Sequence, residues 1–555
     1  MQLRKHQREF KEVIDGIVAG SPVRKIIISA TPGSGKSLIP VLAGQLIASG
    51  KADKLCWICP RMSLQNQGEH NFIDRRFRDL LGHRLTIRAS TNDVNPARGT
   101  DGFITTFQAL GVDRDQTVLN EFRRRRYVLI VDENHHAEAE DGAWMKAIAP
   151  LYSAAAYVVF MSGTMLRGDK KKIAFMPYLD SGDGVFVPCF SETEDTAFIE
   201  YSRTDALADR SIIPLSFILH DGQARWEKDG QEKAAKISTT TPMARDALFT
   251  ALHTGFAQEL LETAIGHWQG YKKDRLSSRL LVVAANIKVT KEYTEFLQGK
   301  GLSAVIATSE DDKEAAKAIK AFKAGKIDVL VTCQVAYEGL DCPAISHIAC
   351  LTNIRSEPWI IQMCGRAVRI DPAAGPYEAQ RGFIFAPADR MFLELARKIE
   401  TDQTSAFALL SSSREKSAGE GDGLGGGPSI TPLESRMIGQ SGIEDLPLFG
   451  GFSDKIRQNM PENVQNLTTA SEAEAELLGA IDSHVRKYAF QNRYNPKRLN
   501  GELYEHFGKP RREMTIKELR DCMAYCQQVW PLTHIRGTGN MRVPIKAHRY
   551  AAAWR

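Results

Sequence analysis

The chain has 555 residues, of which 43% are hydrophobic and 25% are charged, as in a globular protein with several domains. No apolar run approaches the roughly 18 residues of a membrane span, and the first ten residues lack the apolar core of a signal peptide, so we expect neither a membrane protein nor a secreted one. The nine cysteines have no regular spacing, which is typical of reduced thiols in a cytoplasmic protein.

The net charge of +5 is distributed unevenly along the chain. Residues 481–555 contain 15 lysines and arginines and six aspartates and glutamates, a balance of +9, so the other 480 residues sum to −4. A basic excess at one end indicates a region that binds a polyanion.

Two sets of short β-rich runs divide most of the chain. The first set is Ile26–Ala30, Leu55–Cys59, Phe103–Thr106, Tyr127–Val131 and Tyr157–Met161. The second set is Leu280–Ala285, Ser303–Ala307, Asp328–Thr332, His347–Leu351 and Gly382–Ala386. Amphipathic or polar segments separate the runs, and such alternation is typical of βαβ units in a parallel sheet. The sequence therefore predicts the α/β fold class, with tandem parallel-sheet domains over residues 1–165 and 280–410.

Residues 166–279 are less regular and are predicted as a connecting or accessory region. Apolar residues at spacings of four favour one long amphipathic helix from Leu248 to Trp268. The polar residues 222–242 are predicted as a loop or an exposed hairpin.

The first predicted strand runs into a glycine-rich loop, A-T-P-G-S-G-K-S, at residues 30–37. Gly33 and Gly35 allow a tight turn whose N–H groups point at a phosphate, and Lys36 supplies a cation for the β and γ phosphates. The Ser37 hydroxyl suits Mg²⁺, and the helix that begins here adds its positive dipole end. The pattern predicts a P-loop that binds ATP and Mg²⁺ through Thr31, Gly33, Ser34, Gly35, Lys36 and Ser37.

The fourth predicted strand ends in D-E-N-H at residues 132–135. Ligands bind at the carboxyl ends of strands in parallel sheets, so this acidic pair is expected beside the P-loop. Asp132 would hold Mg²⁺ through water, and Glu133 would orient and deprotonate the water that attacks ATP. The alternative is an acidic strand end that faces solvent.

Near residue 362 the chain reads Q-M-C-G-R-A-V-R-I, in which Arg366 and Arg369 follow Gln362 in an otherwise apolar stretch. A guanidinium that is buried in such a stretch needs an anion, and no acidic residue lies within the stretch. The stretch alone leaves open whether these arginines meet a ligand or form surface ion pairs.

These motifs, in this order over residues 1–390, resemble those of superfamily 2 helicases of the DEAD/DEAH-like class. The other motifs that carry the resemblance are L-R-K-H-Q (3–7), I-C-P-R-M-S-L-Q (58–65), I-T-T-F-Q-A-L (104–110), S-G-T (162–164), V-V-A-A-N (282–286) and V-T-C-Q-V-A-Y-E-G-L-D (331–341). The resemblance implies two RecA-like domains that close on ATP. Asn134, Gly163 and Met165 depart from the family pattern, the last two in the motif that links the ATP site to nucleic acid.

The resemblance also implies roles for individual residues. Gln7 would contact the adenine base. Gln362, Arg366 and Arg369 would complete the catalytic set with Lys36, and both arginines would reach across the cleft to the γ-phosphate when the domains close. The remaining nucleotide contacts that the resemblance implies are Gly339 and Asp341.

Nucleic acid would lie on the opposite face, where this family contacts the sugar–phosphate backbone. The residues that the resemblance implies there are Arg61, Thr105, Thr106, Asn286 and Thr332. Two charged runs, Arg123–Arg126 and Lys170–Lys172, are either solvent-exposed or further nucleic-acid contacts.

Residues 411–431 are rich in glycine, serine and charge, which predicts a flexible linker, and a small, mainly helical domain is expected over 432–555. This domain interleaves basic residues with aromatic ones, namely Tyr488, Phe490, Tyr494, Tyr504 and Trp530. The aromatic residues either stack on bases or form the core, with Lys509, Arg511 and Arg512 outside. The domain is expected to bind nucleic acid or a protein partner.

The sequence thus predicts an ATP-dependent helicase or translocase that uses Mg²⁺ and acts on nucleic acid in replication, recombination, repair or defence. DNA is favoured by the resemblance of A-D-R-S-I-I-P, residues 208–214, to motors of recombination, repair and restriction. An RNA helicase of the DExH type is the enzymatic alternative. The alternative from another class is an ATP-gated clamp that binds a duplex without separating its strands.

Overall fold

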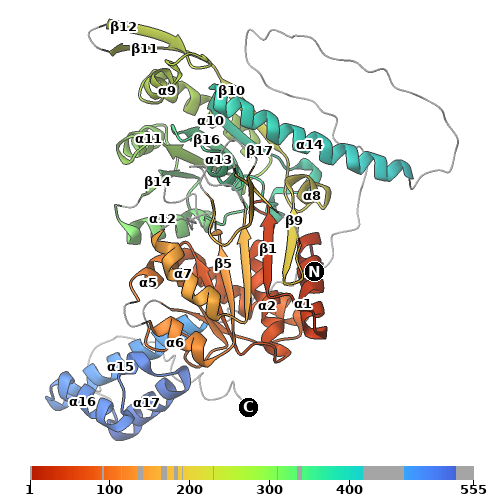
Figure 1. Ribbon diagram of the computed structural model, residues 1–555. Helices are drawn as coiled ribbons and strands as arrows, with labels where there is room; N and C mark the ends of the chain where they lie inside the picture. The colour runs from red at the N-terminus through yellow and green to blue at the C-terminus, as the bar shows by residue number, and fades with distance from the viewer. Residues whose placement is uncertain are drawn as a thin grey trace. The chain divides into compact units, whose positions relative to one another are not determined.

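A computed structural model describes residues 3–90, 93–113, 116–134, 142–163, 172–180, 186–189, 192–228, 231–308, 310–333, 340–416 and 468–532. The chain divides into two compact units, Met1–Leu467 and Thr468–Arg555. The larger unit contains two parallel sheets flanked by helices, and the smaller unit is helical (Figure 1). In the described ranges, no helix is both long enough and apolar enough to cross a membrane.

The first sheet has seven parallel strands in the order β3-β4-β2-β5-β6-β1-β9. They are β1 (Lys25–Ala30), β2 (Lys54–Cys59), β3 (Ile87–Ala89), β4 (Gly102–Thr106), β5 (Tyr127–Asp132), β6 (Tyr157–Ser162) and β9 (Thr196–Tyr201). The five strands that the sequence predicted here are confirmed to within one residue at each end. The sequence did not predict β3 and β9, the two edge strands, since neither forms a continuous apolar run.

Helices cover both faces of the first sheet. They are α1 (Lys5–Ala19), α2 (Ile39–Ala48), α3 (Met62–Ile73), α4 (Arg75–Leu81), α5 (Phe107–Gly111), α6 (Thr117–Arg124) and α7 (Ala143–Ala154). Because side chains alternate along a strand, Ile26 and Ile28 of β1 pack in one core with α1 and α2, whereas Ile27 packs in another core with α6 and α7. Strands that are buried on both faces in this way form a rigid base for the loops at their carboxyl ends.

The second sheet has six parallel strands in the order β10-β17-β16-β13-β15-β14. They are β10 (Leu215–His220), β13 (Arg279–Ala284), β14 (Ala304–Ala307), β15 (Val329–Thr332), β16 (Ile345–Leu351) and β17 (Gly382–Pro387). The five strands predicted for this domain are all present. The prediction of two tandem α/β domains is therefore confirmed.

The second sheet also has a core on each face. Its helices are α10 (Gly255–Lys272), α11 (Ile287–Gly299), α12 (Asp312–Lys323), α13 (Glu357–Cys364) and α14 (Arg390–Lys416). Leu280 and Val282 of β13 pack with α10 and α11, whereas Leu281 and Val283 pack with α12, α13 and α14. The latter core is continuous with the α1–α2 core of the first sheet, which joins the two α/β domains.

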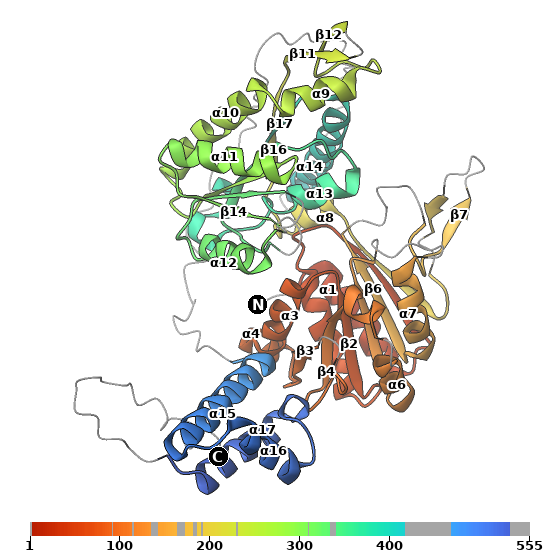
Figure 2. The ribbon, with the colours of Figure 1, turned by 90° about the vertical axis from the view of Figure 1, so that its left-hand side faces the viewer.

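Residues 166–279, predicted as a separate connecting region, are instead divided between the two sheets. Strand β9 pairs with β1 at the edge of the first sheet, and β10 pairs with β17 at the edge of the second. The polar segment forms a hairpin of β11 (Gln223–Lys228) and β12 (Gln231–Lys236) that lies against α9 (Ala244–Leu252) (Figure 2). The other elements of the region are β7 (Tyr178–Asp180), β8 (Phe186–Pro188) and α8 (Arg203–Ala208).

The prediction of one long helix from Leu248 to Trp268 is wrong. Helix α9 ends at Leu252 and α10 begins at Gly255, because Thr254 takes an extended conformation (φ −134°, ψ −170°) as the N-cap residue of α10. The apolar spacing of four continues across this break, and both helices pack in one core. Periodicity alone therefore did not reveal the interruption.

The predicted linker begins later than residue 411. Helix α14 continues through Lys416, since serine, arginine, glutamate and lysine at 411–416 do not break a helix and the first glycine is Gly419. Residues 417–431 of the predicted linker lie outside the described residues.

Over residues 468–532, the smaller unit is a bundle of three α-helices, which confirms the prediction of a helical C-terminal region. The helices are α15 (Ala470–Asn492), α16 (Pro496–Phe507) and α17 (Ile516–Val529). Their shared core contains Ile481, Val485, Leu499, Leu503, Leu519, Cys522, Cys526 and Trp530. Ser/Thr capping boxes at Thr469 and Thr515 begin the first and the third helix.

Candidate active site

The P-loop joins β1 to a short 3-10 helix, Lys36–Leu38, that precedes α2. Gly33 (φ +83°) and Gly35 (φ +84°) take the left-handed conformation that glycine adopts without strain. The Gln7 amide donates a hydrogen bond to the Gly35 carbonyl (3.1 Å). The Arg4 guanidinium donates to the Gly33 carbonyl (3.3 Å). Side chains from the beginning of α1 therefore hold the loop in place.

The two carboxylates at the end of β5 have different surroundings. Asp132 is 9% exposed, and burial with the neighbouring charge of Glu133 raises its pKa to about 7, against the opposing effect of Lys36. Glu133 has a φ of +50°, a left-handed conformation that is strained in any residue other than glycine. The strained turn places the Glu133 carboxylate beside the P-loop, where its Oε1 lies 3.0 Å from Lys36 Nζ.

The other carboxylate oxygen of Glu133 is held by the end of β6. The Ser162 hydroxyl and the Gly163 N–H both donate to Glu133 Oε2, each at 3.3 Å. A Cβ added at Gly163 would lie 2.9 Å from Lys36 Nζ and 3.1 Å from Pro32 Cγ. The glycine that departs from the family pattern therefore allows Lys36 and Glu133 to meet.

The segment after α13 brings the second sheet against the P-loop. A Cβ at Gly365 would lie 2.4 Å from Pro32 Cβ, which requires a residue without a side chain there. Arg366 donates to the Leu340 carbonyl (3.2 Å), and Arg369 forms an ion pair with Asp341. Burial lowers the pKa of Arg369 to about 10, which leaves it charged at neutral pH. In this structure Asp341 supplies the anion that the sequence of this stretch required.

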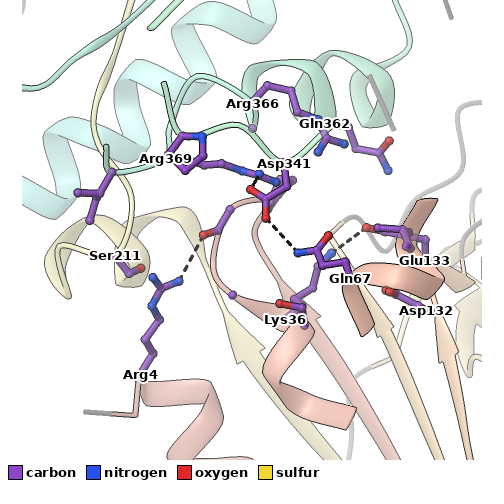
Figure 3. A pocket seen from close by; sticks show the side chains of 18 of the residues that line it. Arg4, Lys36, Gln67, Asp132, Glu133, Ser211, Asp341, Gln362, Arg366 and Arg369 are labelled. Atoms are coloured by element: carbon purple, nitrogen blue, oxygen red, sulfur yellow. Dashed lines mark hydrogen bonds and ion pairs between the residues drawn. The ribbon is translucent and has the colours of Figure 1, made fainter. Parts of the chain in front are cut away.

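These groups line one cavity of about 300 Å³ between the two sheets, named here the central cavity (Figure 3). The predicted residues that line it are Gly33, Gly35, Lys36, Ser37, Asp132, Glu133, Asp341, Gln362, Arg366 and Arg369. The first sheet contributes the P-loop and the carboxylates, and the second contributes the arginines. Ser37 and Asp132 share the cavity, so a hydroxyl and a buried carboxylate are available there to hold Mg²⁺.

Three predicted residues are not on the cavity wall, and the place of a fourth is not described. Thr31, Ser34 and Gln7 are not among the lining residues, and Gly339 lies outside the described residues. The Gln7 amide is occupied, because its Oε1 also accepts from the Arg4 N–H (3.0 Å). Contact between Gln7 and an adenine base stays a prediction.

The sequence did not predict three polar residues of the cavity wall. They are Arg4, Gln67 and Ser211. Gln67 Nε2 donates to Asp341 Oδ2 (3.0 Å), and this hydrogen bond links α3 of the first domain to the second domain. Arg4 and Ser211 lie within segments that carried the resemblance, whereas Gln67 had no signal beyond its place two residues after one of those motifs.

The predicted nucleic-acid contacts all lie at or just after the carboxyl ends of strands, but most of their side chains have structural partners. Thr106 Oγ1 accepts from the Ala109 N–H to cap α5, and Asn286 Oδ1 accepts from the Val289 N–H to cap α11. Thr332 is fully buried and donates to the Ala307 carbonyl (2.9 Å). The two remaining candidates are Arg61, the N-cap residue of α3, and Thr105, which is 3% exposed. Their contacts with nucleic acid stay predictions.

The two charged runs differ in how much of each the structure describes. Arg123, Arg124 and Arg125 are exposed at the end of α6, whereas Arg126 pairs with Asp53 (2.7 Å). Of Lys170–Lys172, only Lys172 is among the described residues. All four arginines of the first run are therefore exposed, and one of them forms an ion pair; nucleic-acid contact stays a prediction for both runs.

Two protein-family models match the two sides of the cavity. "Type III restriction enzyme, res subunit" matches residues 1–167, and "Helicase conserved C-terminal domain" matches residues 259–371. The first range contains β1 to β6 and the second contains β13 to β16.

Similar proteins include two mycobacterial relatives. The uncharacterized protein ML1624 of Mycobacterium leprae is 25% identical over 399 residues, which cover 69% of this chain and 62% of the relative. The uncharacterized protein Rv2917 of Mycobacterium tuberculosis is 24% identical over 478 residues, covering 83% of this chain and 73% of the relative. A solved structure of Mss116p bound to ssRNA and AMP-PNP has a TM-score of 0.45 at 15% identity, and covers 72% of this chain and 75% of that one.

Proposed function

Because the chain belongs to the superfamily 2 helicases and has two RecA-like domains, we propose that it is an ATP-driven motor on DNA, a helicase or a translocase. The central cavity carries the proposal, since there the P-loop of the first sheet faces Arg366 and Arg369 of the second. DNA is favoured over RNA by the first family model, which bears the name of a restriction enzyme subunit. All nine cysteines are free thiols, which favours a cytoplasmic protein.

ATP would bind with its phosphates in the P-loop. The N–H groups of the loop and the Lys36 ammonium supply positive charge to the β and γ phosphates. Lys36 Nζ lies 3.0 Å from Glu133 Oε1, so the ammonium must turn from this carboxylate toward the phosphates. ATP binding would thereby release one oxygen of the general base.

Ser37 and Asp132 would hold Mg²⁺, as their shared place on the cavity wall allows. The pKa of Asp132 is raised to about 7 by burial and by Glu133, and a bound divalent cation would keep this carboxylate ionised at neutral pH. When bound, Mg²⁺ would supply positive charge that offsets the negative charge developing on the phosphate groups.

Glu133 would orient and deprotonate the attacking water. The Ser162 hydroxyl and the Gly163 N–H hold its Oε2, so the carboxylate keeps its orientation after Lys36 leaves Oε1. A base that is fixed before the reaction avoids the entropy cost of ordering it in the transition state.

The arginines would couple ATP to domain movement. Arg369 now pairs with Asp341, and Asp341 also accepts from Gln67 of the first domain. A γ-phosphate would compete with Asp341 for Arg369, and hydrolysis would remove that competitor. In the proposed cycle, the Arg369 guanidinium therefore pairs in turn with the Asp341 carboxylate and with the γ-phosphate.

The proposal is tested by the nucleic acid that stimulates hydrolysis. Phosphate release would be measured with single-stranded, duplex and forked DNA and with single-stranded RNA, beside Lys36→Ala as the inactive control. Strand displacement from the fork and removal of streptavidin from a biotinylated end would be followed in parallel. We expect stimulation by DNA well above that by RNA, together with one of the two mechanical activities.

Each other outcome selects an alternative. Stimulation by RNA alone indicates a DExH RNA helicase. Stimulation by duplex DNA without strand displacement or streptavidin removal indicates an ATP-gated clamp. Hydrolysis that no nucleic acid changes would overturn the proposed motor.

A further inference from the structure

The basic excess of the C-terminal region is not shared evenly by the three-helix unit. Residues 468–532 contain ten lysines and arginines and nine aspartates and glutamates, a net charge of +1. Residues 533–555, outside the described residues, contain five basic and no acidic residues. The net charge of residues 468–532 therefore gives little overall attraction for a polyanion, and binding by these residues must depend on where the charges lie.

The positive charge of the unit is concentrated at the junction of α15 and α16. The segment R-K-Y-A-F-Q-N-R-Y-N-P-K-R, residues 486–498, contains five basic residues and no acidic one. All five are exposed, and Arg498 pairs with Glu502 (3.1 Å). The other four, which have no ion pair among the described residues, are Arg486, Lys487, Arg493 and Lys497.

Basic residues elsewhere in the unit are differently placed. Lys509 pairs with Glu518 (2.7 Å), and Arg511 pairs with Asp482 (2.9 Å). The Lys509 ammonium lowers the pKa of the Glu518 carboxyl to about 2, as expected of a carboxylate with a close cation. Two of the three basic residues that the sequence singled out are thus neutralised within the unit. Arg512 and Lys517 are also exposed, but the densest run of exposed cations lies at 486–498.

Aromatic rings are exposed within this same segment. Phe490 is 83% exposed, although its neighbour Ala489 is buried in the core. Arg486 precedes Phe490 by four residues and so lies on the same side of α15 as the ring, and Arg493 is the C-cap residue that ends the helix three residues after Phe490. An exposed phenylalanine between two cations has a hydrophobic cost in water that a bound partner would remove.

A second ring continues the surface around the turn. Tyr494 is 46% exposed and stacks on Tyr488, with ring centroids 6.1 Å apart and an interplanar angle of 22°. Arg498 lies over the Tyr494 ring, 5.8 Å from its centroid. Tyr494 is therefore held in place by Tyr488 and Arg498 of the unit itself, while nearly half of it stays open to solvent.

We propose that residues 486–498, named here the 486–498 surface, bind single-stranded nucleic acid. The unpaired cations would contact phosphates, and Phe490 and Tyr494 would stack on unpaired bases. The partner is a single strand rather than a duplex, because bases within a duplex already stack on each other and their faces are not available. The surface would add a strand-binding site to the chain without taking part in hydrolysis; this inference rests on the proposed function only for the class of polymer.

The test uses the full chain and a fluorescent 20-nucleotide poly(dT) probe, without nucleotide, at several salt concentrations. The aromatic variant is Phe490→Ala with Tyr494→Ala, and the charge variant is Arg486→Gln with Arg493→Gln. Matched controls in the same unit are Tyr504→Ala, whose ring is 54% exposed, and Arg512→Gln with Lys517→Gln, two exposed cations. Melting curves of all variants show whether the unit is still folded.

The aromatic variant should bind the probe at least about fivefold more weakly, from the range expected for one or two lost stacks. The charge variant should also flatten the dependence of log affinity on log salt by about 1.4, since about 0.7 is expected for each phosphate contact on a single strand. A blunt DNA duplex should lose little affinity in the aromatic variant. Both controls should bind the probe as the unchanged chain does.

Three outcomes would overturn the proposal. The aromatic and charge variants could bind within twofold of the unchanged chain, which would leave the surface to a protein partner. The controls could lose as much affinity as the variants. A loss in the charge variant alone, equal for probe and duplex, would show phosphate contact without stacking and so no preference for a single strand.

Failure of the proposed function is distinguishable from failure of this inference. Hydrolysis stimulated by DNA with no effect of the surface variants on probe binding would overturn the inference alone. The variants could weaken probe binding in a chain whose ATP hydrolysis no nucleic acid changes. That result would overturn the proposed motor function but support the proposed role of the 486–498 surface.

Discussion

The two sides of the central cavity each hold a cation beside a carboxylate, but they hold it differently. On the first side, Lys36 lies 3.0 Å from Glu133, and both residues follow strands of one sheet. On the second side, Arg369 pairs with Asp341, which also accepts from Gln67 across the cavity. Both residues of the first pair belong to the first domain. In the second pair, Asp341 is also hydrogen-bonded to Gln67 of the first domain. In the proposed cycle, ATP would rearrange the first pair locally, but it would have to break a contact between the domains to reach the arginine of the second pair.

Close glycine contacts set the spacing on both sides. Gly163 leaves room for Lys36, and Gly365 brings the second domain against Pro32. Since both contacts meet at the P-loop, small changes there should affect catalysis more than stability. Substitutions on each side can show whether the two pairs contribute differently to ATP hydrolysis.

The largest effect is expected from Lys36→Ala. Loss of the ammonium removes the charge that binds the β and γ phosphates, so ATP hydrolysis should fall by about 10³-fold or more while oligonucleotide binding is kept. Phosphate release and probe binding measure the two properties. Lys11→Ala is the matched control, because Lys11 pairs with Asp15 on the exposed face of α1. Turnover near the unchanged rate in the Lys36 variant would show that the P-loop assignment is wrong.

Arg369→Ala should lower hydrolysis by about 10³-fold, as expected for an arginine finger, with ATP binding retained. Asp341→Asn keeps the shape of the partner and removes its charge. If Asp341 only holds Arg369 before ATP arrives, this variant should lose less than about tenfold. Steady-state kinetics and the affinity for a fluorescent ATP analogue would be compared. Equal losses in both variants would mean that Asp341 acts on the nucleotide itself.

Glu133→Gln should bind ATP but hydrolyse it about 10²–10³-fold more slowly, because the amide is not a base. The amide oxygen can still accept from the Ser162 hydroxyl and the Gly163 N–H, so the local fold should be kept. The complex with ATP and nucleic acid should then persist, which the dissociation rate of a labelled oligonucleotide measures. Loss of nucleotide binding would instead indicate a structural role or a metal ligand.

The smallest effect is expected from Gly163→Ala. The added methyl group would lie 2.9 Å from Lys36 Nζ, so the flexible ammonium moves and hydrolysis should fall by about tenfold or less. Gly266→Ala in α10 is the matched control, since a Cβ there meets nothing within 4 Å. The values of kcat and KM for both variants measure the effect. An unchanged Gly163→Ala enzyme would show that the spacing at β6 does not control Lys36.

The sequence determined the parts of the protein that depend on neighbours in the chain. The P-loop and the acidic pair after β5 were predicted because each needs a fixed order of residues at the end of a buried strand. All ten predicted strands form, because apolar runs between polar segments have few other ways to bury their side chains. The identity of the arginines as cavity residues came from the resemblance and from their place in the motif order.

Only the tertiary structure decided which distant elements meet. Gln67 and Asp341 are 274 positions apart, and no local pattern encodes the hydrogen bond between them. The same holds for β9 and β10, because an edge strand with a partly polar face gains its place from the sheet that it joins. In the C-terminal unit, the sequence counted charges, but the fold paired Lys509 and Arg511 and left the cations around Phe490 exposed. The ion pairs of the folded chain therefore decide which basic side chains can contact a ligand.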